Sequence, residues 1–129
     1  GPKWIRYLPN SSHGISDINL IIDAFSLILI ASQGVEIPSY DFTQLPDGTI
    51  RFTTQGQLSD VRMWQATNTT KRDFRWPVIG AAFTSTTLSP VSPGVYEANV
   101  PTPAQGWTAY YIQATFVTST SQLVKVSTG

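Results

Sequence analysis

The sequence contains no cysteine and a single histidine, and only 12% of its 129 residues are charged. Without cysteine, disulfide scaffolds, thiolate metal sites and cysteine nucleophiles are excluded. One histidine cannot form a histidine-rich metal site, and we expect neither a metal nor a cofactor. Eight basic and eight acidic side chains give a net charge near zero, which argues against nucleic-acid binding.

The low charge also bears on location, because the charged fraction is well below the usual ~25%. Ser, Thr, Asn and Gln must therefore form most of the polar surface. With four Trp and five Tyr, this composition is more typical of an extracellular β-protein than of a cytosolic enzyme. Sequons at Asn10 and Asn68 agree with a secreted glycoprotein, although chains rich in Ser and Thr produce sequons by chance.

The first 36 residues hold one strand-like segment and the only segment with a helical pattern. Residues 3–8 combine β-forming side chains and end at Pro9, which predicts a strand. A helix is predicted over residues 18–33, because Ser16 can cap its start and Gly34 can end it.

This helix is apolar nearly all round, interrupted only by Asn19, Asp23 and Ser26. Such a pattern predicts burial on both sides. The stretch is shorter than the ~20 residues of a membrane span, and Asp23 lies within it. A small β-domain cannot cover both sides, so helix 17–33 is predicted to need a partner, either an absent upstream portion or another chain.

From Tyr40 onward the apolar pattern changes to period two, which is typical of strands. Turn signals such as Asp47-Gly48 separate the segments. Strands are predicted over residues 40–44, 48–54, 60–66, 80–88, 94–100, 107–117 and 122–127. Their length and spacing indicate an immunoglobulin-like or fibronectin-III-like sandwich, with Trp64 and Trp107 as core or corner residues.

His13 is the side chain that titrates near neutral pH without perturbation. It follows a predicted strand and precedes a predicted buried helix, where an α/β-hydrolase carries its triad histidine. A single loop histidine is more often a solvated side chain, and the sequence has no Gly-x-Ser-x-Gly elbow. Asp17 and Asp23 are better explained as a helix-terminal charge and a buried or interfacial polar group than as a catalytic pair.

The charged segment from Lys71 to Trp76 has two interpretations. It is either a basic-aromatic binding patch or a structural pair between an arginine and Asp73, with an arginine stacked on Trp76. The structural interpretation is favoured, because such motifs are common in sandwich loops. A third and weaker alternative is a carbohydrate-binding surface that uses Trp76 or Trp107.

Three segments carry a family resemblance: GPKWIRYLPNSSHG, VRMWQATNTTKRDFR and GVYEANVPTPAQGWTAYYIQATF. In this order they resemble the C-terminal part of the PhoPQ-activated pathogenicity-related (autocrine proliferation repressor-like) family. That family is similar to secreted α/β-hydrolases whose Ser nucleophile and acid lie upstream of the region matched. The resemblance implies that residues 3–8 are the last core strand, that His13 is the triad histidine, and that helix 17–33 packs on the hydrolase sheet. A glycan at Asn10 would then crowd the rim of the active site.

The sequence therefore predicts a mainly β fold in two parts. Residues 1–36 are expected to be the last strand, His loop and last helix of a hydrolase core, and residues 37–129 a β-sandwich. The expected function is that of the C-terminal segment of a secreted serine-type hydrolase, acting on a peptide or ester and inactive alone. The alternative is a non-enzymatic extracellular module that assembles through its apolar helix and sandwich edges.

Overall fold

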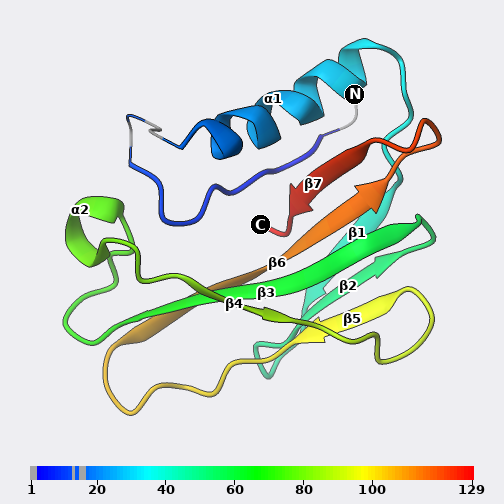
Figure 1. The fold of residues 1–129 in the computed structure, drawn as a ribbon. Coiled ribbons are helices and arrows are strands. Elements are labelled where there is room, and N and C mark those ends of the chain that lie inside the picture. Colours follow the sequence, from blue (N-terminus) through cyan, green and yellow to red (C-terminus); the bar gives the residue numbers. More distant parts are fainter. Residues whose placement is uncertain (1–2, 13, 15–16) are drawn as a thin grey trace.

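The chain is mainly β, and the computed structural model describes residues 3–12, 14 and 17–129. One antiparallel sheet has the strand order β1-β2-β5 and the other the order β4-β3-β6-β7 (Figure 1). The strands are β1 (Tyr40–Gln44), β2 (Ile50–Thr54), β3 (Leu58–Asn68), β4 (Thr84–Thr87), β5 (Val95–Ala98), β6 (Trp107–Val117) and β7 (Leu123–Ser127). The helices among the described residues are α1 (Ile18–Ser32) and the short α2 (Trp76–Ile79).

Both ends of α1 are closed by local hydrogen bonds. At its start, a carboxylate oxygen of Asp17 accepts the backbone N–H of Asn19 at 2.9 Å. Asp17 is thus the N-cap in place of Ser16, which lies outside the described residues. Just past its end Gly34 has a φ of +72°, and it and the next residue donate backbone N–H groups back into the last turn. The predicted end of the helix is confirmed.

The core lies between the two sheets and is built from the inward-facing side of each strand. The rings of Phe52 on β2 and Phe116 on β6 pack with centroids 6.4 Å apart. Tyr40 on β1 stacks on Phe52 of the same sheet at 5.5 Å and lies 6.1 Å from Phe116, so aromatic rings join the two sheets. The alternation predicted for residues 48–54 is confirmed within β2, where Ile50 and Phe52 are buried and Arg51 is exposed, but Thr49 just before β2 is buried as well.

The second face of the four-stranded sheet is covered by the N-terminal segment and α1, which lie across β6 and β7 (Figure 1). Leu27 and Ile30 are the buried residues of α1. Strand β6 is consequently buried on both faces over residues 111–116. The alternating residues of β6 were assigned to two opposite faces of the sheet, and both faces prove to be buried.

The strand predicted over residues 3–8 is not found. Alternate residues of this segment point inward, as in a strand, but one backbone hydrogen bond joins it to β7, from Ser127 N–H to Ile5 O at 2.7 Å. The side-chain hydroxyl of Ser127 accepts the N–H of Tyr7 at 3.1 Å in place of a further backbone bond. Because a β-ladder needs a series of backbone pairs, the segment is extended without forming a strand.

The strand predicted over residues 80–88 is found only in part. The chain forms helix α2 just before the predicted strand 80–88, and β4 begins only at Thr84. Pro77 lies in the first turn of α2, where a missing N–H costs nothing. Of the two positions predicted for Trp107, the core is wrong and the corner fits, because Trp107 is 45% exposed and begins β6 at one end of the sandwich.

Candidate functional site

His13, the predicted catalytic residue, lies outside the described residues, and its role remains a prediction. The described part of its loop begins at Asn10, whose backbone has a φ of +55°. The Asn10 side chain donates to the carbonyl oxygen of Phe83 and accepts its N–H, both at 2.9 Å. This pair of hydrogen bonds holds the start of the His loop against the approach to β4.

Two adjoining hollows lie beside this loop. The first has a volume of about 470 Å³ and is lined by both neighbours of position 13, Ser12 and Gly14, together with Pro77 of α2. The second, here called the aromatic hollow, has a volume of about 370 Å³ and is lined by Phe83 and Tyr111 among others. Ser11, Arg75 and Trp76 line both hollows. The geometry therefore joins the His loop to an aromatic cavity formed by segments far apart in the sequence.

The charge at the shared wall is already balanced within the chain. Arg75 donates two hydrogen bonds to the carboxylate of Asp73, from Nε at 2.9 Å and from Nη2 at 2.6 Å. The predicted pair between an arginine and Asp73 is confirmed. Hydrogen bonds from Arg75 lower the pKa of the Asp73 carboxyl to about 2.

This pair predicts how Asp73 titrates. Its contribution to stability should be complete above pH ~4 and lost as the pH falls through about 2, because the folded pKa lies below the unfolded one. In a carbon-detected NMR titration, Arg75→Ala should move the midpoint of Asp73 back toward 3.8. Arg72→Ala is the matched control and should leave it in place. A wild-type midpoint near 3.8 would contradict the pairing.

The wall of the aromatic hollow contains the buried phenol of Tyr111. Tyr111 packs against the rings of Tyr7 and Phe83, with centroids 5.2 and 6.1 Å away. Its hydroxyl is buried and has no hydrogen-bond partner among the described residues. Burial raises the pKa of Tyr111 above its usual value, because desolvation disfavours the charged phenolate.

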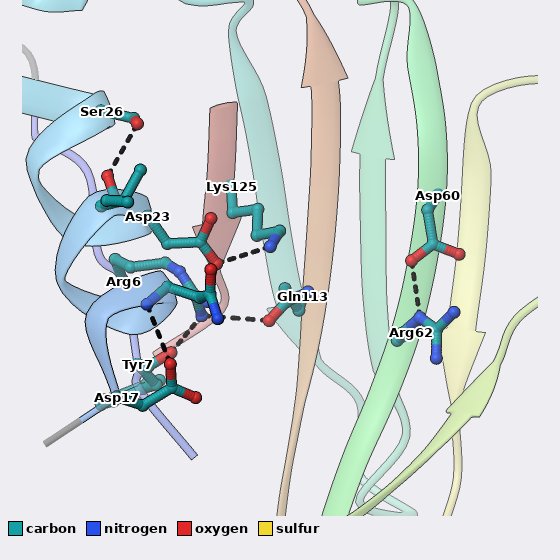
Figure 2. A network of polar contacts seen from close by, with 11 residues as sticks. Arg6, Tyr7, Asp17, Asp23, Ser26, Asp60, Arg62, Gln113 and Lys125 are labelled. Atoms are coloured by element: carbon teal, nitrogen blue, oxygen red, sulfur yellow. Dashed lines mark hydrogen bonds and ion pairs between the residues drawn. The ribbon is translucent and has the colours of Figure 1, made fainter. Parts of the chain in front are cut away.

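The two acidic residues near the His loop have structural roles. Asp17 caps α1, and Asp23 accepts from Lys125 Nζ at 2.5 Å and pairs with Arg6 at 3.5 Å. Arg6 also donates to the side-chain oxygen of Gln113 at 3.0 Å. Figure 2 shows this network between the N-terminal segment, α1 and the sheet. The helix-terminal role predicted for Asp17 is confirmed, and Asp23 is a polar group between α1 and the sheet.

The side chains of both sequon asparagines, Asn10 and Asn68, form hydrogen bonds that stabilise loops. Asn68 is 7% exposed, donates to Asp73 O at 2.8 Å, and accepts from Thr70 and Lys71. These bonds shape the turn that leads to Arg75. Glycosylation of Asn10 or Asn68 stays a prediction, and in this conformation a glycan would require either side chain to leave its hydrogen bonds.

The described part of the chain shows no cluster of three or more His, Asp or Glu side chains suited to a metal ion. No helix within it has the length and hydropathy to cross a membrane. Sequence reasoning missed the aromatic hollow, since Tyr7, Trp76, Phe83 and Tyr111 come from distant segments. Pro77 was the one local sign that a helix would begin there.

Comparison with known proteins places the chain in a family. Its sequence matches the profile of the PhoPQ-activated pathogenicity-related proteins over residues 1–75, from the N-terminal segment through β3 and into the loop beyond. It is 30% identical to autocrine proliferation repressor protein A of Dictyostelium discoideum over 137 aligned positions, which cover 89% of the chain and 27% of that protein. The chain thus spans about a quarter of this relative. No solved structure matches significantly. The chain belongs to the PhoPQ-activated pathogenicity-related protein family.

Proposed function

We propose that this chain is the C-terminal segment of a secreted serine-type hydrolase that acts on a peptide or ester. Its His13 would accept the proton of a Ser nucleophile supplied by an upstream portion and return it to the leaving group. The β-sandwich is an accessory domain beside the site. Alone, the chain lacks a nucleophile elbow and is inactive.

The observation that carries this proposal is the outward face of α1. Five large apolar residues of this helix are 56–63% exposed: Ile18, Ile22, Phe25, Ile28 and Leu29. Their spacing places them along one side of the helix, opposite the buried Leu27 and Ile30. An exposed apolar stripe of this kind is typical of an interaction surface. It is the face that the last helix of a hydrolase would pack on the core sheet.

The N-terminal segment supports the same arrangement. Ile5 and Tyr7 are exposed, whereas Arg6 between them is buried. This segment exposes apolar residues and forms no β-ladder with the described strands. It is therefore suited to pair with a strand of an upstream portion of the protein. Since the chain spans 27% of its amoebal relative, an upstream portion is the natural partner for both surfaces.

A finer fold assignment belongs to this proposal. We infer that residues 1–36 belong to the hydrolase core and that residues 37–129 form a fibronectin-III-like sandwich. The strand orders β1-β2-β5 and β4-β3-β6-β7 agree with the fibronectin arrangement, in which the first, second and fifth strands form the smaller sheet. Secretion is supported by the low charge of the chain.

Labelling with a fluorophosphonate probe tests the hydrolase. Co-expression of this chain with the upstream portion should restore labelling of the Ser nucleophile, and neither part should be labelled alone. His13→Ala should abolish labelling without preventing association, because it removes the general base. Lys71→Ala, in an exposed loop, is the control. Undiminished labelling of His13→Ala would remove His13 from the mechanism.

The exposed stripe on α1 also favours a second function. A non-enzymatic extracellular module could use this stripe and the open sheet edges to assemble with copies of itself. Light scattering would then show an oligomer that Phe25→Glu converts to a monomer, and the upstream portion would add no labelling. A well-folded wild-type monomer at high concentration would argue against this alternative.

A further inference from the structure

The aromatic hollow beside the His loop has six aromatic residues among the fourteen that line it. Tyr7 and Phe83 flank Tyr111 in its wall, and Phe74 and Trp76 line it from the loop before α2 and from α2 itself. A volume of about 370 Å³ is within the usual range of ligand pockets, which begins near 300 Å³. The space can hold one aromatic side chain with part of its backbone.

The pocket offers little to a charged ligand. Arg75 is the lining residue with a charged side chain, and the Nε–Nη2 edge of its guanidinium group is occupied by two hydrogen bonds to Asp73. A ligand carboxylate would have to compete with Asp73, which is already ionised at neutral pH because its pKa is about 2. The charge pattern therefore favours a neutral occupant.

The pocket also offers little to a sugar. Asn10, the amide side chain on its wall, is held by two hydrogen bonds to the backbone of Phe83. Recognition of sugar hydroxyls needs several free polar groups beside a stacking ring. Aromatic walls favour an aromatic ring over an aliphatic chain, because ring pairs add ~0.5–1.5 kcal/mol beyond the area that they bury.

We propose that this hollow is a specificity pocket for a neutral aromatic side chain of the substrate. The inference rests on the proposed function, since the hollow lined by Ser12 and Gly14 connects to it through Ser11, Arg75 and Trp76. A substrate whose scissile bond lies at the His loop would place a neighbouring phenylalanine-like group across Trp76 and into the pocket. The substrate class is thus a peptide or ester with an aromatic residue beside the cleaved bond.

The test is a binding titration on the 129-residue chain itself, followed by NMR of the tryptophan indole N–H groups. N-acetyl-phenylalanine amide should bind saturably and about threefold or more tightly than N-acetyl-leucine amide. N-acetyl-phenylalanine, which has a free carboxylate, should bind no more tightly than the amide. Trp76→Ala should weaken binding about tenfold, because it removes one wall. Trp107→Ala is the matched control and should leave binding unchanged, because Trp107 lines neither hollow.

Binding to the isolated chain needs no nucleophile, so this result is independent of fluorophosphonate labelling. The proposed pocket would be overturned, even if labelling succeeds, by any of three results. These are binding that does not saturate, tighter binding of the leucine compound, and an equal loss of affinity in the two Trp variants. Binding of a disaccharide in place of the aromatic amide would overturn it as well. Phe83→Leu provides a second variant if Trp76→Ala fails to fold, and it should weaken phenylalanine amide more than leucine amide.

Discussion

Replacing Asp23 with Asn is expected to lower the free energy of unfolding by about 3 kcal/mol. Asp23 is the carboxylate shared by Arg6 and Lys125 (Figure 2). The Arg6 side chain is only 6% exposed, and its burial lowers the pKa of the guanidinium against the opposing effect of Asp23. Without Asp23 this buried cation loses its counter-charge, and the N-terminal segment and α1 lose the contact that holds them together. Urea unfolding followed by tryptophan fluorescence measures the loss.

Asp60→Asn is the matched control for this prediction. Asp60 pairs with Arg62 at 2.7 Å, but this pair lies along one strand and both side chains are substantially exposed. Such a surface pair contributes about 0–1 kcal/mol, so the variant should be close to wild type. The double variant Arg6→Met, Asp23→Leu should recover much of the stability, because apolar side chains can replace a buried ion pair. Equal losses for Asp23→Asn and Asp60→Asn would contradict the proposed anchoring role.

Replacing Gly106 with Ala is expected to destabilise the chain by about 3 kcal/mol or more. Gly106 has a φ of +84° just before β6. A Cβ atom there would lie 2.5 Å from Thr69 Cα and would overlap the carbonyl oxygen of Asn68. Both contacts are with backbone at the end of β3, the partner of β6 in the longest strand pair. The strain cannot be relieved by turning a side chain, so the pair must shift.

Gly34→Ala separates the two causes of the expected destabilisation, which are the left-handed backbone conformation and the overlap of the new Cβ atom with other backbone atoms. Gly34 has a similar φ of +72°, but a Cβ there meets no atom within 4 Å. Only the left-handed backbone is then strained, and the cost should be about 1 kcal/mol. Thermal unfolding of both variants measures the difference. A Gly106→Ala variant as stable as Gly34→Ala would show that the β3–β6 end can move freely.

Elements with local signals could be predicted from the sequence. The apolar stretch before Gly34 predicted α1 to within one residue of its end, and the alternation over residues 107–117 predicted β6 with the same bounds. Asp47-Gly48 predicted the first hairpin, where Gly48 has a φ of +88°. In each case the stop signal and the periodicity belong to neighbouring residues, so no distant contact was needed.

The candidate site could be predicted only in part. His13 and the loop around it follow from the family resemblance, but the hollow beside that loop depends on Tyr7, Trp76, Phe83 and Tyr111 meeting in space. Residues 3–8 carried a strand pattern, yet a strand also requires a neighbouring backbone to pair with. The strands that pair are distant in the sequence, and the local hydropathy pattern of one strand does not identify its partner.

By itself, the sequence determined the class of the chain, since the absence of cysteine, the low charge and the period-two pattern leave a β-rich domain without disulfides. It also showed that α1 is too apolar for a free surface helix. Only the tertiary structure decided which face of α1 is covered and which remains exposed. Only the fold decided that both faces of β6 are buried. The reason is physical: hydropathy reports that a residue favours burial, whereas the packing of distant segments decides what buries it.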